Sequence, residues 1–207
     1  MYGSIQGSNN VINALQHIDN IFFLKIDLKN YFSNISNKQV HRALLKNGFS
    51  WEVARILTKL TTYHCSLPQG APSSPVLANL VFVKTAKQLE DFIKANGITF
   101  TVFLDDLVFS SKKCFKELVP GILNIMRENG FFPHNNKINY RKYNCDVTGL
   151  SVGGGKLRIA PKMRQGALTN ARVNVYIRFV NEYYQAYLNK KNSNQALSSA
   201  LIHFFGK

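Results

Sequence analysis

The sequence predicts an α+β protein, with helices packed on an antiparallel sheet, and three observations lead to this prediction. Hydrophobic residues make up 45% of the chain, which is enough to bury a core and excludes a chain that is disordered by composition. Residues 21–27 and 98–110 are apolar, β-branched or aromatic runs of strand length. In other segments apolar residues recur at the spacing of amphipathic helices, so both kinds of element are expected around one core.

Each element is predicted from its own pattern. Residues 21–27 predict a buried strand that ends at Asp27. Residues 98–110 predict a hairpin with Asp105-Asp106 at the bend. Helical periodicity predicts two amphipathic helices within 37–62, which separate at Asn47-Gly48 and include apolar Val53, Ile56 and Leu60. The same periodicity predicts helices from Ser74 to about Asn96 and at 114–129, and a helical tail from Pro161. The other expected elements are a loop with a short helix at 1–20, a loop at 67–72, and strand-like pieces at 145–152 and 156–160.

The charge balance is strongly basic. Lys and Arg number 26 against 11 Asp and Glu, which gives a formal net charge of +15. This charge favours a polyanionic partner, nucleic acid or an anionic membrane surface, over a basic protein without one. Three cysteines without CxxC spacing predict reduced thiols. No apolar run approaches the roughly 20 residues that span a bilayer, and the start lacks a signal-peptide pattern, so a cytoplasmic protein is expected.

The placement of the carboxylates is informative. Asp105 and Asp106 are neighbours in an otherwise apolar segment, where two carboxylates are costly unless a divalent cation neutralises them. Asp27 ends the other apolar strand, and three such carboxylates could hold two Mg²⁺ ions roughly 3.5–4 Å apart, as in-line phosphoryl displacement requires. Taken alone, the pair is better explained as a turn, since Asp favours turns. The apolar flanks and Asp27 make the metal interpretation equally good.

Four segments resemble the polymerase motifs of reverse transcriptases, in the order of that family. They are Phe23–Ile35 (motif A), Leu67–Asn79 (motif B of the bacterial group), Phe103–Asp106 (motif C, usually YxDD) and Asn136-Lys137 (the motif D lysine). Two signatures, NAxxH at Asn13–His17 and VTG at Val147–Gly149, narrow the resemblance to retron-type enzymes. The resemblance covers about residues 3–180.

The resemblance implies a right-hand polymerase palm with partial fingers and a short helical thumb. Residues 1–20 would be a remnant of the fingers, and residues 21–160 the palm with inserted fingers helices at about 37–66. Residues 161–207 would begin the thumb. Family members carry an earlier fingers segment whose Lys and Arg residues hold the dNTP triphosphate, and we expect this chain to lack it.

The resemblance also implies the metal ligands. Asp27, Asp105 and Asp106 would be the catalytic residues and would bind two Mg²⁺ ions, with Mn²⁺ as an alternative metal. The backbone carbonyl of Leu28 would be a further ligand.

Nucleotide-binding roles are implied for four residues. Phe32 fits the steric gate that would clash with a 2′-OH, although an ordinary core phenylalanine is the alternative. Gln69 would hydrogen-bond the nucleotide or template, and Gly70 would permit close backbone approach. Lys137 would neutralise pyrophosphate or donate a proton to it, and a solvated surface lysine is nearly as good an explanation.

Primer or RNA contacts are implied for five more residues. They are Phe103, Thr148, Gly149, Asn13 and His17. Asn13 and His17 are four residues apart and would share a helix face, a pattern that more often serves packing. The hairpin at Thr148-Gly149 resembles the primer grip.

The implied activity is retron-type, RNA-templated DNA synthesis by two-metal transfer from dNTPs to a primer 3′-OH, in anti-phage defence. Its partners would be an RNA template, the primer and DNA product, a structured non-coding RNA and an effector protein, with no membrane. Phe103 in place of the usual Tyr, and Leu104 where a small residue is common, depart from the family pattern. The alternatives are a defence-associated polymerase that is template-independent or protein-primed, and a catalytically incomplete RNA-binding remnant.

Overall fold

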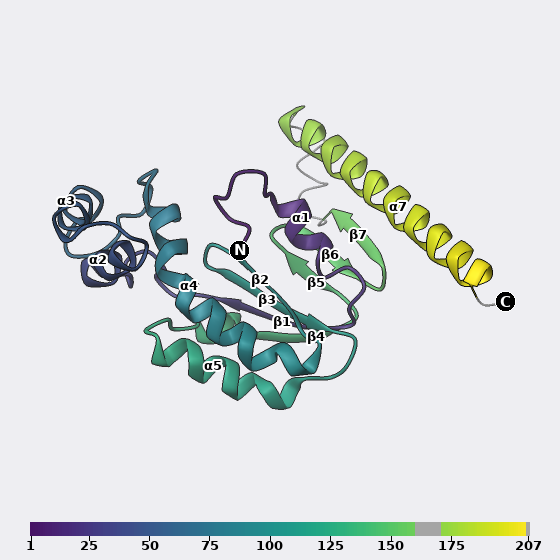
Figure 1. Ribbon diagram of the computed structural model, residues 1–207, viewed down its shortest axis with the longest axis horizontal. Coiled ribbons are helices and arrows are strands. Elements are labelled where there is room, and N and C mark those ends of the chain that lie inside the picture. Colours follow the sequence, from purple (N-terminus) through teal and green to yellow (C-terminus); the bar gives the residue numbers. More distant parts are fainter. Residues whose placement is uncertain (160–170, 206–207) are drawn as a thin grey trace.

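The computed structural model describes residues 1–159 and 171–205, with side chains as far as Ser193. Its centre is a four-stranded antiparallel sheet in the order β2-β3-β1-β4 (Figure 1). The strands are β1 (Phe22–Asp27), β2 (Thr99–Phe103), β3 (Asp106–Ser111) and β4 (Asn139–Lys142). The predicted strand and hairpin are confirmed, except that Leu104 and Asp105 form the bend and Asp106 already begins β3.

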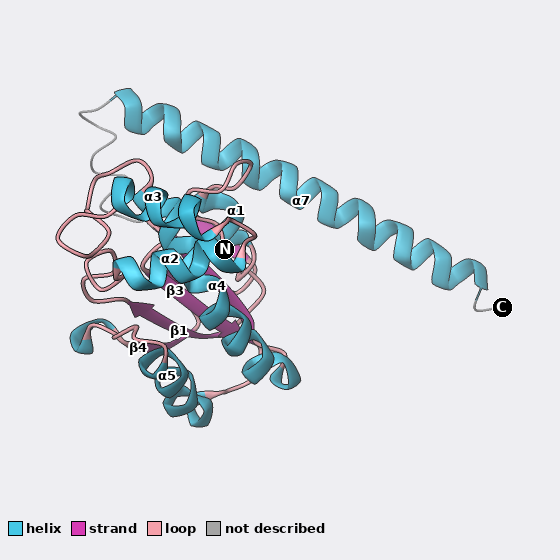
Figure 2. Cartoon of the chain, turned by 60° about the vertical axis from the view of Figure 1, so that its left-hand side comes forward, coloured by secondary structure: helices cyan, strands magenta, loops and turns pink. Residues whose placement is uncertain are grey.

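Two helices cover one face of this sheet, α4 (Ser74–Ile93) and α5 (Val119–Glu128) (Figures 1 and 2). Each of these helices adjoins a short 3₁₀ turn, as is common at helix ends: η1 (Lys94–Asn96) comes after α4, and η2 (Lys116–Leu118) comes before α5. Leu24 and Ile26 of β1 are fully buried under them, and burial of each such side chain stabilises the fold by about 2 kcal/mol. Because side chains alternate along a strand, Lys25 and Asp27 must point to the opposite face.

A second layer lies over part of that opposite face. It contains α1 (Asn10–Leu15) and a three-stranded sheet of β5 (Cys145–Val147), β6 (Leu150–Gly153) and β7 (Lys156–Ile159) (Figure 1). Its buried residues form one cluster with Phe23 and Val108 of the main sheet. The segment predicted as a single piece at 145–152 is a hairpin, because Thr148 (φ +48°) and Gly149 (φ +84°) form a two-residue turn.

The helix α7 (Ala171–Phe205) packs on this second layer and then extends past it (Figures 1 and 2). Val180 is buried there, the Tyr184 hydroxyl donates to the Gly155 carbonyl at 3.2 Å, and Lys191 pairs with Asp19 at 2.7 Å. The predicted helical tail is confirmed over this range, whereas its predicted start at Pro161 lies outside the described residues. No helix in the described ranges combines the length and apolar character needed to cross a membrane.

The helices α2 (Asn37–Lys46) and α3 (Trp51–Thr61) project from the main sheet as a pair (Figure 1). Ser36 and Ser50 accept hydrogen bonds from the backbone at their first turns, and the predicted break at Asn47-Gly48 is confirmed.

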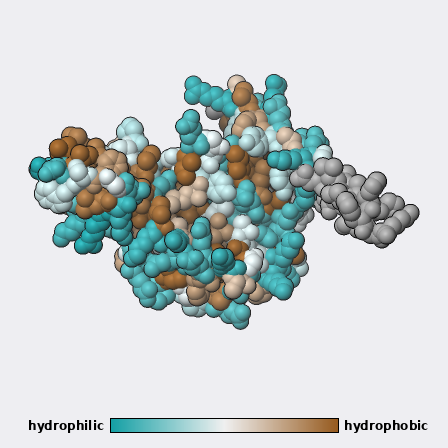
Figure 3. All heavy atoms as spheres, in the orientation of Figure 1, coloured by the Kyte–Doolittle hydropathy of each residue, from teal (hydrophilic) through white to brown (hydrophobic). Residues whose placement is uncertain are grey.

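The apolar face predicted for α3 is uncovered. Val53, Ile56 and Leu60 are 43%, 50% and 77% exposed, because α3 packs on its neighbours through Ala54 and Thr58 instead. Figure 3 shows the resulting apolar surface at the outer end formed by these two helices.

The NAxxH residues Asn13 and His17 are core residues. Asn13 is 1% exposed and His17 is 0% exposed, so the expected contact of either side chain with primer or RNA is wrong for this structure. The two ring nitrogens of His17 lie 2.6 Å from the hydroxyls of Ser110 and Thr101, which ties the end of α1 to β2 and β3. Burial lowers the pKa of His17 to about 4.

We therefore expect a pH dependence of stability that comes from His17. In the unfolded chain its pKa is near 6.5, so protons bind the unfolded state first as the pH falls. The contribution is complete above pH 6.5 and is lost between pH 6.5 and about pH 4, with a limit of about 3 kcal/mol. Urea unfolding across this range should show the loss in the wild type and a shallower pH dependence in His17→Asn. Equal slopes in the two proteins would contradict the assignment.

Candidate active site

The register of two strands brings Asp27 and Asp106 together. They are direct partners in the β1–β3 pair, and both point to the face opposite α4 and α5. Side chains that are directly opposite in an antiparallel pair have Cβ atoms about 4.5–5.5 Å apart. Two strand-end carboxylates therefore face solvent side by side, each with about a fifth of its side chain exposed.

Asp105 lies in the turn beside this pair. Its backbone carbonyl accepts a hydrogen bond from the N–H of Leu28 at 3.0 Å, which joins the turn to the end of β1. Burial raises the pKa of Asp105, and the negative charges of Asp106 and Asp27 raise it further. Its own backbone hydrogen bond and the charge of Lys137 act in the opposite direction. The three predicted carboxylates thus influence one another electrostatically.

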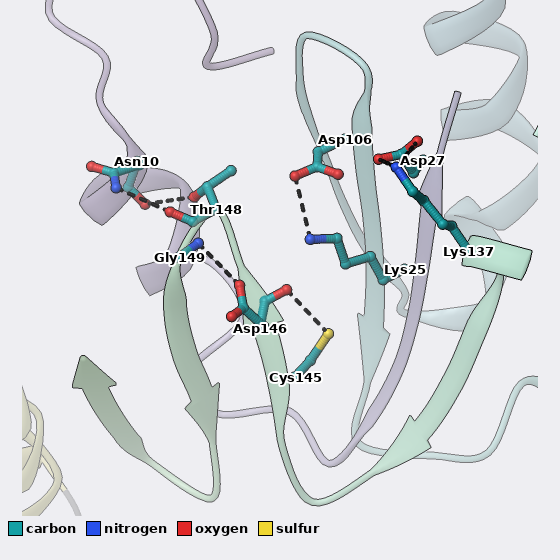
Figure 4. A network of polar contacts seen from close by, with 9 residues as sticks. All are labelled: Asn10, Lys25, Asp27, Asp106, Lys137, Cys145, Asp146, Thr148 and Gly149. Atoms are coloured by element: carbon teal, nitrogen blue, oxygen red, sulfur yellow. Dashed lines mark hydrogen bonds and ion pairs between the residues drawn. The ribbon is translucent and has the colours of Figure 1, made fainter. Parts of the chain in front are cut away.

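Lysines neutralise the facing pair. Lys137, at the end of η3 (Asn135–Lys137), places its Nζ 3.0 Å from both carboxylate oxygens of Asp27 (Figure 4). Lys25 Nζ lies 3.3 Å from Oδ2 of Asp106. Lys25 is two residues before Asp27, on the same face of β1, and strand periodicity could have identified it from the sequence.

The donor atoms suit Mg²⁺ only in part. No group of three His, Cys, Asp or Glu side chains within the described ranges is arranged to hold a metal ion, so the three-carboxylate cage is not preformed. The Asp27–Asp106 pair still offers the hard oxygen ligands that Mg²⁺ prefers, and Mg²⁺ commonly uses one or two carboxylates and completes its shell with water and substrate phosphates. The residues therefore fit a metal that binds together with a phosphate-bearing substrate. The ligand role of the Leu28 carbonyl stays a prediction.

The predicted steric gate, Phe32, packs beside Tyr31. Phe32 is half-buried against the main core, and its ring lies 5.4 Å from that of Tyr31. Tyr31 is buried, and burial together with the charge of Asp105 raises its pKa, so Tyr31 is within electrostatic reach of Asp105. No sequence pattern distinguishes Tyr31 from the other aromatic residues of this segment. The role of Phe32 as a steric gate stays a prediction.

Gln69 and Gly70 occupy an exposed loop before α4, and Gly70 has φ +91°. That backbone conformation favours glycine. The Ser74 hydroxyl closes the loop by donating to the Pro68 carbonyl at 2.7 Å. The role of Gln69 in nucleotide binding stays a prediction.

The turn at Thr148-Gly149 is held rigidly (Figure 4). The Asn10 side chain donates to the Thr148 carbonyl at 3.2 Å, and the Gly149 N–H donates to Asp146 at 3.0 Å. Between this hairpin and the main sheet is a pocket of about 330 Å³, lined by Lys25, Asp27, Lys137, Asn139, Arg141, Cys145 and Asp146. The predicted primer-contacting hairpin therefore borders the same pocket as Asp27.

The turn that carries Asp105 rests on the start of the chain. Leu104 has φ +57°, and Phe103 is the partner of Asp106 in the β2–β3 pair. The Tyr2 N–H donates to the Val102 carbonyl at 2.7 Å, and the Asn79 side chain donates to the Gly3 carbonyl at 2.7 Å. A Cβ atom at Gly3 would lie 2.8 Å from the backbone nitrogen of Leu104.

The fold and this arrangement of carboxylates define a polymerase palm, and solved structures show the same fold. Telomerase from Candida albicans, in complex with a TWJ fragment of telomeric RNA, aligns with a TM-score of 0.59 and 13% identity, over 73% of this chain and 33% of that chain. The foamy viral protease-reverse transcriptase in complex with an RNA/DNA hybrid aligns with a TM-score of 0.55 and 15% identity, over 88% of this chain and 24% of that one.

The chain belongs to the family described as reverse transcriptase (RNA-dependent DNA polymerase), which it matches over residues 2–152. It is 32% identical to the retron Ec86 reverse transcriptase of Escherichia coli over 152 residues, 71% of this chain and 47% of the relative. It is 29% identical to the retron Se72 reverse transcriptase of Salmonella heidelberg over 225 residues, 98% of this chain and 57% of the relative. The predicted retron-type resemblance is confirmed, and the chain spans about half the length of these curated relatives.

Substitution of Gly3 should disturb the turn that holds Asp105. In Gly3→Ala the new methyl group meets backbone, which cannot move as a flexible side chain would, so the free energy of unfolding should fall by about 1–3 kcal/mol. Urea unfolding measures this change, with Gln6→Ala, an exposed neighbour, as the control. Wild-type stability in Gly3→Ala would contradict the close packing.

Proposed function

We propose that this chain forms the palm and part of the fingers of a retron-type reverse transcriptase, and that it catalyses RNA-templated DNA synthesis. The observation that carries the proposal is the opposition of Asp27 and Asp106 on one face of the palm, with Asp105 beside them. The family membership and the net charge of +15 support RNA and DNA as partners.

Each residue at the site has a role in this proposal. Asp27, Asp105 and Asp106 would hold two divalent cations, Mg²⁺ or Mn²⁺, and these ions would lower the pKa of the primer hydroxyl and neutralise charge on the departing pyrophosphate. Phe32 excludes a 2′-OH by contact with the sugar. Lys137 donates hydrogen bonds to Asp27 in this structure. In the proposed reaction it donates them instead to the phosphates of the nucleotide or of pyrophosphate.

The biological setting is part of the same proposal. The resemblance to retron enzymes supports a structured non-coding RNA as template, an effector protein as partner and a role in anti-phage defence. The cysteines Cys65, Cys114 and Cys145 are free thiols, which supports a reducing, cytoplasmic location.

Loss of the turn carboxylates should abolish synthesis. In Asp105→Asn/Asp106→Asn the side-chain shape is kept and two negative charges are lost, so primer extension with Mg²⁺, primed RNA and dNTPs should fall more than about 100-fold. The matched control is Glu90→Gln/Asp91→Asn, which alters two adjacent exposed acids on α4. Equal primer extension by the two double variants would contradict the proposal. Tight RNA binding without extension by the wild type would favour a non-catalytic RNA-binding role.

Phe32 should set the choice of sugar. Phe32→Val removes the planar ring, and the ratio of kcat/KM for dNTP over rNTP should fall about 10- to 100-fold. Single-nucleotide incorporation measures this ratio. Phe49→Val, at an exposed phenylalanine outside the site, is the control and should leave the ratio unchanged. An unchanged ratio in Phe32→Val would identify Phe32 as a packing residue.

A further inference from the structure

Lys25 is the part of the site that the proposed mechanism does not use. It lies on β1, which is paired on both sides by β3 and β4, so its backbone is fixed. Its direct partner on β3 is Val108, and Asp106 is the diagonal neighbour that its ammonium group reaches, at 3.3 Å. About a quarter of the Lys25 side chain is exposed.

Lys25 also lines the pocket of about 330 Å³ between the main sheet and the β5–β6 hairpin. Arg141 on β4 is in the same wall, on the same face of the sheet, because its partner on β1 is Phe23. Lys137 contributes a third positive charge, so the pocket contains three cations against Asp27 and Asp146. Asn139 adds an amide that can donate a hydrogen bond. This composition suits a phosphate group.

We propose that Lys25 alternates between two anionic partners, Asp106 in the absence of a divalent cation and a substrate phosphate in the adjacent pocket once a cation has bound. The inference rests on the proposed function, because it requires that Asp106 bind the cation. A divalent cation at Asp106 replaces the ammonium group as counter-ion and repels it. The flexible four-carbon stem of lysine lets the ammonium group turn from the carboxylate into the pocket while the backbone stays in place.

The arrangement gives Lys25 two opposite effects. Without substrate it competes with the cation for Asp106, so it weakens metal binding. With substrate it contributes one phosphate contact beside Arg141, so it strengthens substrate binding in a metal-dependent way. A lysine that only stabilised the sheet would produce neither effect.

The first test is a Mn²⁺ titration of the chain without nucleic acid, followed by the electron paramagnetic resonance signal of free Mn²⁺. Lys25→Met, and Lys25→Gln as a second variant, should bind Mn²⁺ roughly two- to fivefold more tightly than the wild type, the range expected for loss of one partly exposed ion pair. Lys25→Arg keeps the charge and should retain wild-type affinity. Lys87→Met is the control, because Lys87 is an exposed residue of α4, on the other face of the sheet, and its substitution lowers the net charge by the same amount.

Unchanged or weaker Mn²⁺ binding in both charge-removing variants would overturn the proposal for Lys25. Asp106→Asn separates this failure from failure of the proposed function. If Asp106→Asn binds Mn²⁺ as the wild type does, the metal site itself is wrong, whatever Lys25 does.

The second test measures the affinity for a primer–template duplex against salt concentration, without dNTPs. With Mg²⁺, Lys25→Met should reduce the slope of log affinity against log salt by about 0.9, the value for one phosphate contact. With EDTA the slopes of variant and wild type should coincide, because Lys25 is then paired with Asp106. A parallel measurement of dNTP affinity with Mg²⁺ shows whether the phosphate belongs to the duplex or to the nucleotide. No metal-dependent change in either affinity would refute the second position of Lys25.

Discussion

The antiparallel register of β1 and β3 is the constraint on which the site depends. A shift of one residue would turn Asp27 or Asp106 into the apolar layer under α4 and α5, where Leu24, Ile26 and Phe109 are completely buried. The register is therefore fixed by the core and not by the carboxylates. The hydrophobic effect supplies the free energy that holds two like charges side by side.

Charge compensation follows from that constraint. Two carboxylates that cannot separate need positive charge nearby, and this chain supplies it from Lys25 on the same strand and Lys137 after α5. The Asp27–Asp106 pair is thus balanced by lysines, and no three-ligand group is preformed within the described ranges. Under the proposed function, a cation that enters would displace ammonium groups, and its binding would be coupled to the arrival of anions that accept them.

Much of the fold was predictable because its strongest patterns are local. The apolar run of β1, the hairpin around Asp105 and the Asn47-Gly48 break depend on neighbouring residues only. The strand β4 was not predicted, since Asn-Tyr-Arg-Lys at the sheet edge has no apolar alternation. Its pairing depends on β1, which is distant in sequence.

The site was less predictable, because it also depends on contacts between residues that are distant in sequence. Sequence periodicity shows which residues share a face, but not what covers that face. Val53, Ile56 and Leu60 share a helix face that no other described element covers, while His17 is enclosed by Thr101 and Ser110 from strands far along the chain. Asp27 and Asp106 were expected to be neighbours from the resemblance and are direct partners in the long-range β1–β3 pair, whereas the binding of metal by all three carboxylates stays a prediction.

The left-handed backbone of Leu104 has a consequence for how the position of Asp105 is determined. A leucine in this conformation costs about 1–2 kcal/mol relative to its preferred backbone regions, so the hairpin alone does not favour the turn that it adopts. Compensating hydrogen bonds come from the N–H of Tyr2, which donates to the Val102 carbonyl, and from the N–H of Leu28, which donates to the Asp105 carbonyl. Both donors are distant from the hairpin in sequence. The position of Asp105 therefore depends on the beginning of the chain and on the end of β1 as well as on the hairpin.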